Sequence, residues 1–174
     1  MSEMASITAH VPVDRRIPLL VAVASLAGLA VAFASQYWGG LQPCILCIYQ
    51  RYPYGITATL GVIGILAAAR PAVLRAILLL AALAFAVDAG IAAFHVGVEQ
   101  GWWQGTAECG STLDLTLSPE ELKSQLMNQP LVRCDEVAWS LFGISMAGYN
   151  FLYALALTAV ALWFALRRRR VEAA

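Results

Sequence analysis

Long uncharged stretches constrain this chain more than any other feature. The first, residues 17–38, contains no charged residue. At about 1.5 Å of rise per residue, a helix of that length crosses the roughly 30 Å hydrocarbon core of a bilayer. Three further apolar stretches follow at about 44–69, 73–96 and 141–166, and 60% of all residues are hydrophobic. The sequence therefore predicts an all-α membrane protein, a single-domain four-helix transmembrane bundle covering the whole chain.

The first stretch has a second interpretation as a secretory signal peptide. Ala32-Phe33-Ala34 has the small-x-small form of a cleavage site. The stretch is long for the apolar part of a signal peptide, and cleavage would remove the helix expected beside the second one. We favour a retained span.

The arginines predict how this bundle lies in the membrane. With four spans, three groups border the same side, namely Arg15 with Arg16, Arg70 with Arg75, and the run 167–170. By the positive-inside rule that side is cytoplasmic, so both termini are expected inside and the loop of residues 97–140 faces the periplasm of a bacterial inner membrane. The terminal arginine run abuts an apolar stretch, so we expect no nucleic-acid partner.

A C-x-x-C motif, Cys44 to Cys47, opens the second apolar stretch directly after Pro43. Proline suits the start of a helix, so Cys44 is expected in the first turn, where unpaired N–H groups and the helix dipole favour a thiolate. Arg51 follows Cys47 by four positions and shares its helix face. A zinc half-site, or a chance pair of cysteines in a membrane helix, remains an alternative for this motif.

Cys109 and Cys134 form a second pair within the long loop. An even number of cysteines suggests disulfides and an oxidising compartment, unless the four gather around a metal. A structural staple is the simple interpretation of the loop pair. Two dithiols at the same membrane face, however, can exchange electrons through thiolate attack on a disulfide.

A short helix is predicted inside the loop. Ser118 is a candidate N-cap, Pro119 suits the first helical position, and Glu121 completes a capping box. Leu117 and Leu122 are spaced for a hydrophobic staple, and the helix has one apolar face. We expect an amphipathic helix at the membrane surface.

Together these motifs resemble the DsbB family of bacterial inner-membrane proteins. The resemblance covers nearly the whole chain, from the first apolar stretch through the fourth. It rests on the segment Pro43 to Arg51, on His95 at the end of the third stretch, on the loop pair Cys109 and Cys134, and on Cys134-Asp135 followed by Trp139-x-x-Phe142-Gly143-Ile144-Ser145-Met146.

The resemblance implies a membrane enzyme that re-oxidises a periplasmic DsbA-like thiol oxidase and passes the electrons to the membrane quinone pool, as ubiquinone or menaquinone, without a metal. Cys109 would form the mixed disulfide with the partner, and Cys134 would then attack a disulfide between Cys44 and Cys47. The resemblance gives quinone contact to the Cys47 thiolate. It also implies quinone-binding roles for Arg51, on the face of Cys47, and for His95.

Two other functions remain open. One is an enzyme of the vitamin K epoxide reductase type with another partner, although its active pair opens a later span. The other is a non-catalytic membrane module that binds a metal through all four cysteines, with His95 as a further ligand.

Asp88 lies outside the family pattern. It precedes His95 by seven residues, on a similar helix face about 10 Å deeper. An ionisable residue inside a membrane span is a functional candidate, here for proton delivery to a reduced quinone. A hydrogen-bonded packing residue is the equal alternative.

Overall fold

Helices dominate the computed structural model, which describes residues 15–109, 118–128 and 132–167. The helices are α1 (Arg16–Tyr37), α2 (Ile45–Tyr49), α3 (Arg51–Leu66), α4 (Pro71–Glu99), α5 (Pro119–Asn128) and α6 (Met146–Leu166), and the short elements are the 3-10 turn η1 (Ala107–Cys109) and the strands β1 (Ser140–Leu141) and β2 (Ile144–Ser145). Within the described ranges, α1, α4 and α6 are long and apolar enough to cross a membrane. This composition is that of an all-α membrane protein.

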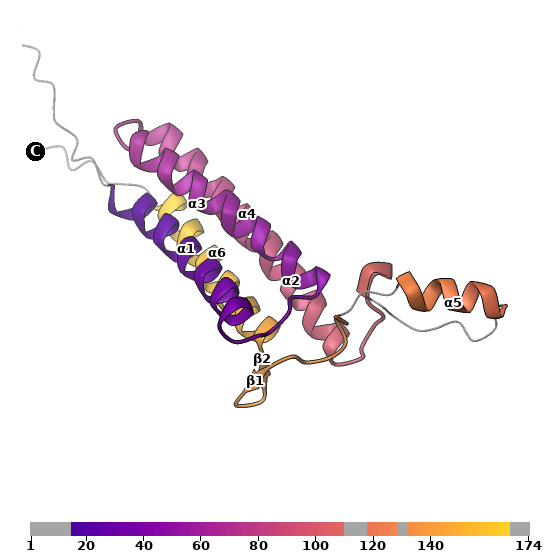
Figure 1. Cartoon of the computed structure of the whole chain (residues 1–174). Helices are drawn as coiled ribbons and strands as arrows, with labels where there is room; N and C mark the ends of the chain where they lie inside the picture. Colours follow the sequence, from indigo (N-terminus) through magenta and orange to yellow (C-terminus); the bar gives the residue numbers. More distant parts are fainter. Residues whose placement is uncertain (1–14, 110–117, 129–131, 168–174) are drawn as a thin grey trace, which may run out of the picture.

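The long helices lie side by side. α3 packs against both α1 and α4, and α6 packs along α4, as Figure 1 shows. The buried core between them contains Tyr54, Leu78 and Phe85. α2 and the two strands lie at one end of this bundle, and α5 lies outside it.

The second apolar stretch is divided rather than continuous. α2 ends before Gln50, which separates it from α3. α3 is 16 residues long, shorter than the roughly 20 residues that a membrane span needs. A span over the predicted range 44–69 therefore requires α2 and α3 together.

The helix of the predicted fourth stretch, about 141–166, begins at Met146 rather than near its start. Ser140 pairs with Ser145 in an antiparallel hairpin, and Phe142 and Gly143 form its turn with φ values of 52° and 78°. Two positive φ angles in succession match the twist of a two-residue hairpin loop. The Ser145 hydroxyl then accepts a hydrogen bond from the Gly148 N–H at 3.1 Å and caps α6. Apolar composition alone does not separate this hairpin from the helix.

Inside the loop, α5 begins where the capping motif predicts a helix. The Ser118 N–H donates to a Glu121 carboxylate oxygen at 3.1 Å, and the Glu121 N–H donates to the Ser118 hydroxyl at 3.4 Å. Leu117, of the expected staple, lies outside the described residues. Contact of α5 with a membrane surface stays a prediction.

Two glycines let α1 and α3 approach closely. A Cβ atom on Gly61 would lie 2.7 Å from the Ala22 nitrogen and 2.8 Å from the Pro18 oxygen, and one on Gly64 would lie 2.7 Å from the Pro18 Cβ. Small residues at such positions allow backbone-to-backbone packing where a lipid environment gives helices little hydrophobic reason to associate. This interface holds α1 beside the segment that follows the C-x-x-C motif.

Gly61→Ala is expected to destabilise the bundle by about 1–3 kcal/mol, because the new methyl group meets immobile backbone atoms. Gly90→Ala is the matched control, since a Cβ there meets nothing within 4 Å. A mid-helix alanine without a clash should stabilise the helix slightly. Thermal unfolding in detergent measures both, and equal melting temperatures for the two variants would contradict the close packing of α1 on α3.

Candidate dithiol site

Cys44 occupies the N-cap of α2, one residue before the first helical turn. Its backbone is extended, and its sulfur accepts a hydrogen bond from the Cys47 N–H at 3.4 Å. The sulfur thus takes the place of a capping oxygen, at the positive end of the helix dipole. Cys47 Sγ lies 3.2 Å from Cys44 Sγ, and neither cysteine is in a disulfide. A sulfur held at this N-cap is suited to carry negative charge.

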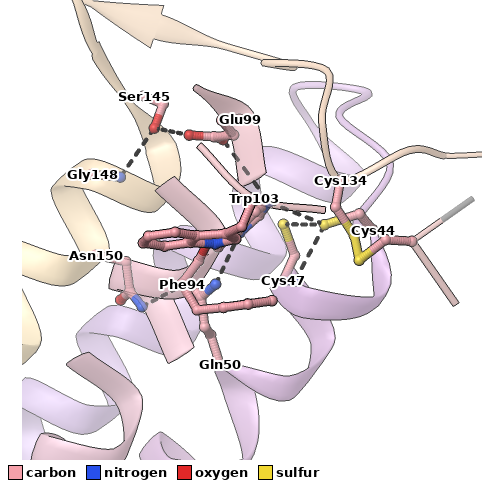
Figure 2. Close-up of polar contacts among 12 residues, drawn as sticks. Cys44, Cys47, Gln50, Phe94, Glu99, Trp103, Cys134, Ser145, Gly148 and Asn150 are labelled. Atoms are coloured by element: carbon pink, nitrogen blue, oxygen red, sulfur yellow. Dashed lines mark hydrogen bonds and ion pairs between the residues drawn. A yellow bond between two sulfur atoms is a disulfide. The ribbon is translucent and has the colours of Figure 1, made fainter. Parts of the chain in front are cut away.

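The loop cysteines form a disulfide that packs onto this motif. Cys109 and Cys134 are bonded to each other and are 2% and 0% exposed. They share one buried cluster with Cys44, and Cys47 packs against that cluster. Figure 2 shows Cys134 beside the two free cysteines. All four cysteines predicted as catalytic are therefore gathered at one end of the bundle.

Charged residues flank Cys134 on both sides. The Arg133 guanidinium donates to both carboxylate oxygens of Asp135, at 2.9 and 2.5 Å. This contact holds the pKa of the exposed Asp135 carboxyl below its ordinary value. Arg133 also lies 3.5 Å from a Glu136 carboxylate oxygen, so one guanidinium serves both carboxylates of the segment.

His95 lies directly beside Cys44. Its Nε2 is 3.5 Å from the Cys44 sulfur and 3.9 Å from a Glu99 carboxylate oxygen, while its Nδ1 is 3.0 Å from the Gln50 side-chain nitrogen. Glu99 in turn accepts a hydrogen bond from the Ser145 hydroxyl. His95 is thus a contact of the first cysteine of the motif, and it is 3% exposed.

A chain of polar side chains continues from Gln50 into the bundle. The Asn150 amide nitrogen lies 2.7 Å from the Gln50 oxygen and 3.1 Å from an Asp88 carboxylate oxygen. The Tyr54 hydroxyl donates to the Asn150 oxygen at 2.6 Å. The sequence marks Asp88 as an ionisable residue in a membrane span, whereas Gln50 and Asn150 acquire a role only from these contacts. Asn150 is nevertheless the lone amide side chain in α6, which is a signal in the sequence.

A cavity of about 410 Å³ opens between α1 and α6 beside the motif. Its wall is largely apolar, and the polar side chains in it come mainly from the site just described. The lining includes Gly28, Val31 and Ala32 of α1, Met146, Ala147 and Tyr153 of α6, and Cys44, Cys47, Arg51, Tyr54 and His95. Mostly apolar pockets with a few placed polar groups are typical of small-molecule sites.

Arg51 lines this cavity but is held by α1. Its Nη1 donates to the Gln36 side-chain oxygen at 2.7 Å and its Nη2 to the Ala32 carbonyl at 3.4 Å, and the guanidinium lies 4.9 Å from the centre of the Phe33 ring. The Arg51 Nε is buried and has no hydrogen-bond partner among the residues that the structure describes. Cys47 and Arg51 line the same cavity, although the break at Gln50 places them in α2 and α3 rather than on one helix face. The Arg51 guanidinium is anchored on α1.

The sulfur pair and His95 also match part of a metal site. One ligand atom from each of Cys44, Cys47 and His95 lies within 4.8 Å of the others. The loop cysteines are bonded to each other and supply no thiolate. Geometry alone is therefore compatible with a three-ligand metal site as well as with a redox site.

A membrane helix bundle with a free dithiol packed against a loop disulfide defines the class of membrane thiol–disulfide oxidoreductases. Residues 14–164 match a family model described as Disulfide bond formation protein DsbB. The chain belongs to the DsbB family, and thus to the disulfide-forming membrane oxidoreductases.

Curated relatives agree with this assignment. The chain is 31% identical over 172 residues to Disulfide bond formation protein B of Azoarcus sp. (strain BH72), covering 91% of this chain and 96% of the relative. It is 33% identical over 159 residues to the protein of that name from Xanthomonas campestris pv. campestris (strain 8004), covering 88% and 92%. An uncharacterized protein of Rickettsia prowazekii (strain Madrid E) is 27% identical over 136 residues, 77% of each chain. No solved structure matches the chain.

Proposed function

We propose that this protein is an inner-membrane thiol:quinone oxidoreductase that re-oxidises a periplasmic DsbA-like thiol oxidase. One observation carries the proposal. The loop disulfide and Cys44 share a buried cluster, and Cys47 lines the adjacent apolar cavity. Electrons have a short route from the loop disulfide, through the two sulfurs of the motif, to a membrane-soluble ligand in the cavity.

The first exchange takes place at the loop disulfide. A thiolate of the reduced partner attacks Cys109 Sγ, which breaks the bond to Cys134 and releases Cys134 as a thiolate. The partner's second thiolate then displaces Cys109 and closes the partner's own disulfide. The electron pair now resides on the Cys109 and Cys134 dithiol.

The second exchange moves the electron pair from the loop cysteines to the C-x-x-C motif. The Cys134 thiolate attacks Cys44 of an oxidised Cys44–Cys47 pair, and Cys47 leaves as a thiolate. Cys44 is the sulfur for this attack because it belongs to the cluster that contains Cys134. Cys109 then displaces Cys44, which restores the loop disulfide and leaves the motif reduced. A bonded loop pair with two free motif cysteines corresponds to the state after this step.

The residues around the cavity fit a quinone. The cavity volume of about 410 Å³ lies within the range of about 300–1,000 Å³ for small-molecule sites. Arg51 contributes a buried Nε without a partner, so it has a donor to offer to a carbonyl oxygen. Cys47 and His95 complete the polar part of the wall. Ubiquinone and menaquinone share the carbonyl oxygens that this arrangement would contact.

A bound quinone supplies a two-electron acceptor that becomes a quinol. Such an acceptor is needed because a DsbA-type oxidant has a potential of about −120 mV, above that of ordinary thiols. The role of this chain is to hold Cys47 beside the acceptor, to offer the Arg51 donor and to exclude water. In the overall balance, the two protons taken up by the quinol equal the two that the partner's thiols release when they become a disulfide.

The topology belongs to the same proposal. α1, α2 with α3, α4 and α6 would form four spans, with both termini cytoplasmic and the cysteines facing the periplasm. The support is the arginines at Arg15, Arg16, Arg70 and Arg75 near one set of helix ends.

A cysteine placed at Ala72 in a cysteine-free background is expected to resist a membrane-impermeant maleimide added to intact, outer-membrane-permeabilised cells. Gln104→Cys is the matched control, since the exposed Gln104 lies in the loop after α4 and should react. Labelling of Ala72→Cys from the periplasm would refute the orientation.

The test of the function mixes the purified protein in detergent with a reduced DsbA-like partner and ubiquinone or menaquinone, and follows thiols and quinone absorbance together. One quinone should be consumed for every two partner thiols lost. Tight binding of zinc by the reduced protein, together with no quinone-dependent loss of thiols, would favour the metal-binding module instead.

A further inference from the structure

The polar chain between Asp88 and Cys44 has a direction, because amide nitrogens donate hydrogen bonds and oxygens accept them. The Tyr54 hydroxyl donates to the Asn150 oxygen, so the Asn150 nitrogen faces both Asp88 and Gln50. With Asp88 ionised, a reversed amide would set the Asn150 oxygen against a carboxylate oxygen, with two acceptors face to face. Asp88, which is 0% exposed, therefore orients the amide of Asn150.

The orientation passes on to Gln50. Since Asn150 donates to the Gln50 oxygen at 2.7 Å, the other end of the Gln50 amide is its NH₂ group. That group lies 3.0 Å from His95 Nδ1. Nδ1 must therefore accept, and a neutral His95 carries its proton on Nε2.

The other side of the imidazole ring agrees with this assignment. His95 Nε2 faces the Cys44 sulfur at 3.5 Å and a Glu99 carboxylate oxygen at 3.9 Å. Both groups accept hydrogen bonds when ionised. A donor thus lies on the Nδ1 side of the ring, and two acceptors lie on the Nε2 side.

We propose that Asp88 and Asn150 are positioning residues, which act through Gln50 to hold His95 as the Nε2–H tautomer that donates to Cys44. The assignment of Asp88 and Asn150 goes beyond the family pattern. The role of this His95 tautomer in electron transfer rests on the proposed function, because a donor at Nε2 stabilises the Cys44 thiolate formed when the motif is reduced.

The same arrangement has a consequence for metals. Cys44, Cys47 and His95 are close enough to share a metal ion, but a metal needs the lone pair of a deprotonated ring nitrogen. With Nδ1 occupied by Gln50 and the proton on Nε2, that lone pair is absent from the side facing the sulfurs. The polar chain therefore disfavours zinc at a cluster of ordinary zinc ligands.

The test uses ¹⁵N-histidine-labelled full-length protein in detergent with the motif reduced. Cys109 and Cys134 are replaced by Ser to keep other thiols away, and His10→Gln leaves His95 as the only histidine. Two-bond ¹H–¹⁵N spectra identify which ring nitrogen is protonated. The proposal expects Nε2–H in this background and in Asp88→Asn, whose amide oxygen still accepts. Asn150→Leu should populate the Nδ1–H form, and Asp88→Leu should do so to a smaller extent.

Thr57→Val is the control for general loosening of the bundle, since Thr57 is buried and its hydroxyl contacts Ser25 and the backbone oxygens of Pro53 and Tyr54. It should leave the tautomer unchanged. Nδ1–H in the parent protein, or an unchanged Nε2–H signal in Asn150→Leu, would overturn the proposal. Neither result depends on quinone activity, so failure of this inference is distinct from failure of the proposed function.

Zinc affinity gives a second measurement on the same proteins. Asn150→Leu frees the Gln50 amide to turn, so the reduced variant should bind zinc at least about tenfold more tightly than the parent, the size expected for one buried hydrogen bond. Thr57→Val should match the parent. Equal zinc affinity of the parent and Asn150→Leu would count against the role of the polar chain.

Discussion

Cys134→Ser is expected to abolish oxidation of the partner while the helix bundle remains folded. Serine is close to cysteine in size but takes no part in thiol–disulfide exchange, so no thiolate can pass electrons from the loop to Cys44. The packing of α3 on α1 and α4, and of α6 on α4, does not involve the loop. Partner thiol loss should fall to the uncatalysed rate, while the melting temperature of the variant stays close to that of the parent.

Cys109→Ser sharpens this prediction by trapping an intermediate. The Cys134 thiol is then free, and it should form a stable disulfide with Cys44 once quinone has oxidised the motif. Cys44 is the expected partner because it lies in the buried cluster with Cys134. Tandem mass spectrometry of the digested protein locates the bond. A trapped bond to Cys47, or loss of folded protein with activity kept by the remainder, would argue for a structural role of the loop disulfide.

Arg51→Ala is expected to raise the KM for quinone and to slow turnover, by about ten- to hundredfold in kcat/KM. This range corresponds to the loss of a hydrogen bond to a charged group, about 1.5–3 kcal/mol. The charge on a quinone oxygen grows as electrons arrive, so the guanidinium contact strengthens during the reaction. Arg51→Lys keeps the charge without the planar fork and should retain part of the activity.

Two controls separate this role from anchoring on α1. Gln36→Leu removes the main α1 partner of Arg51 but leaves the guanidinium, so it should change quinone kinetics less than Arg51→Ala. The rate of thiol–disulfide exchange between the loop disulfide and the partner, measured without quinone, should be equal in the parent, Arg51→Ala and Gln36→Leu. Quinone kinetics of Arg51→Ala equal to those of the parent would leave Arg51 as an anchor only.

The sequence predicts the long helices well, because a membrane demands length and lack of charge, and both can be counted. It predicts the start of α5 for a different reason, since the capping box of Ser118 and Glu121 is a local arrangement. The hairpin before α6 escapes detection because Phe142 adopts a positive φ, which apolar composition does not reveal. The break at Gln50 has a local signal, since Pro53 has no N–H to donate to the Tyr49 carbonyl at the end of α2.

The residues of the candidate site divide in the same way into those that the sequence marks and those that only the packing of the helices reveals. Family motifs single out all four cysteines, and the structure brings these together. The contacts of Arg51 with α1 and of His95 with Cys44 depend on how helices distant in sequence pack. The four-residue spacing of Cys47 and Arg51 predicts a shared helix face, but Cys47 lies in α2 and Arg51 begins α3. Spacing also does not identify Gln36 of α1 as the partner of Arg51. Gln50 and Asn150 acquire a meaning only when α3, α4 and α6 are assembled around them.

The burial of the loop disulfide implies a kinetic gate. Cys109 and Cys134, whose residues are 2% and 0% exposed, are out of reach of a thiolate on another protein. Under the proposed function, the disulfide must therefore become exposed before the partner can attack Cys109. The closed arrangement permits only internal exchange, and the open one only exchange with the partner.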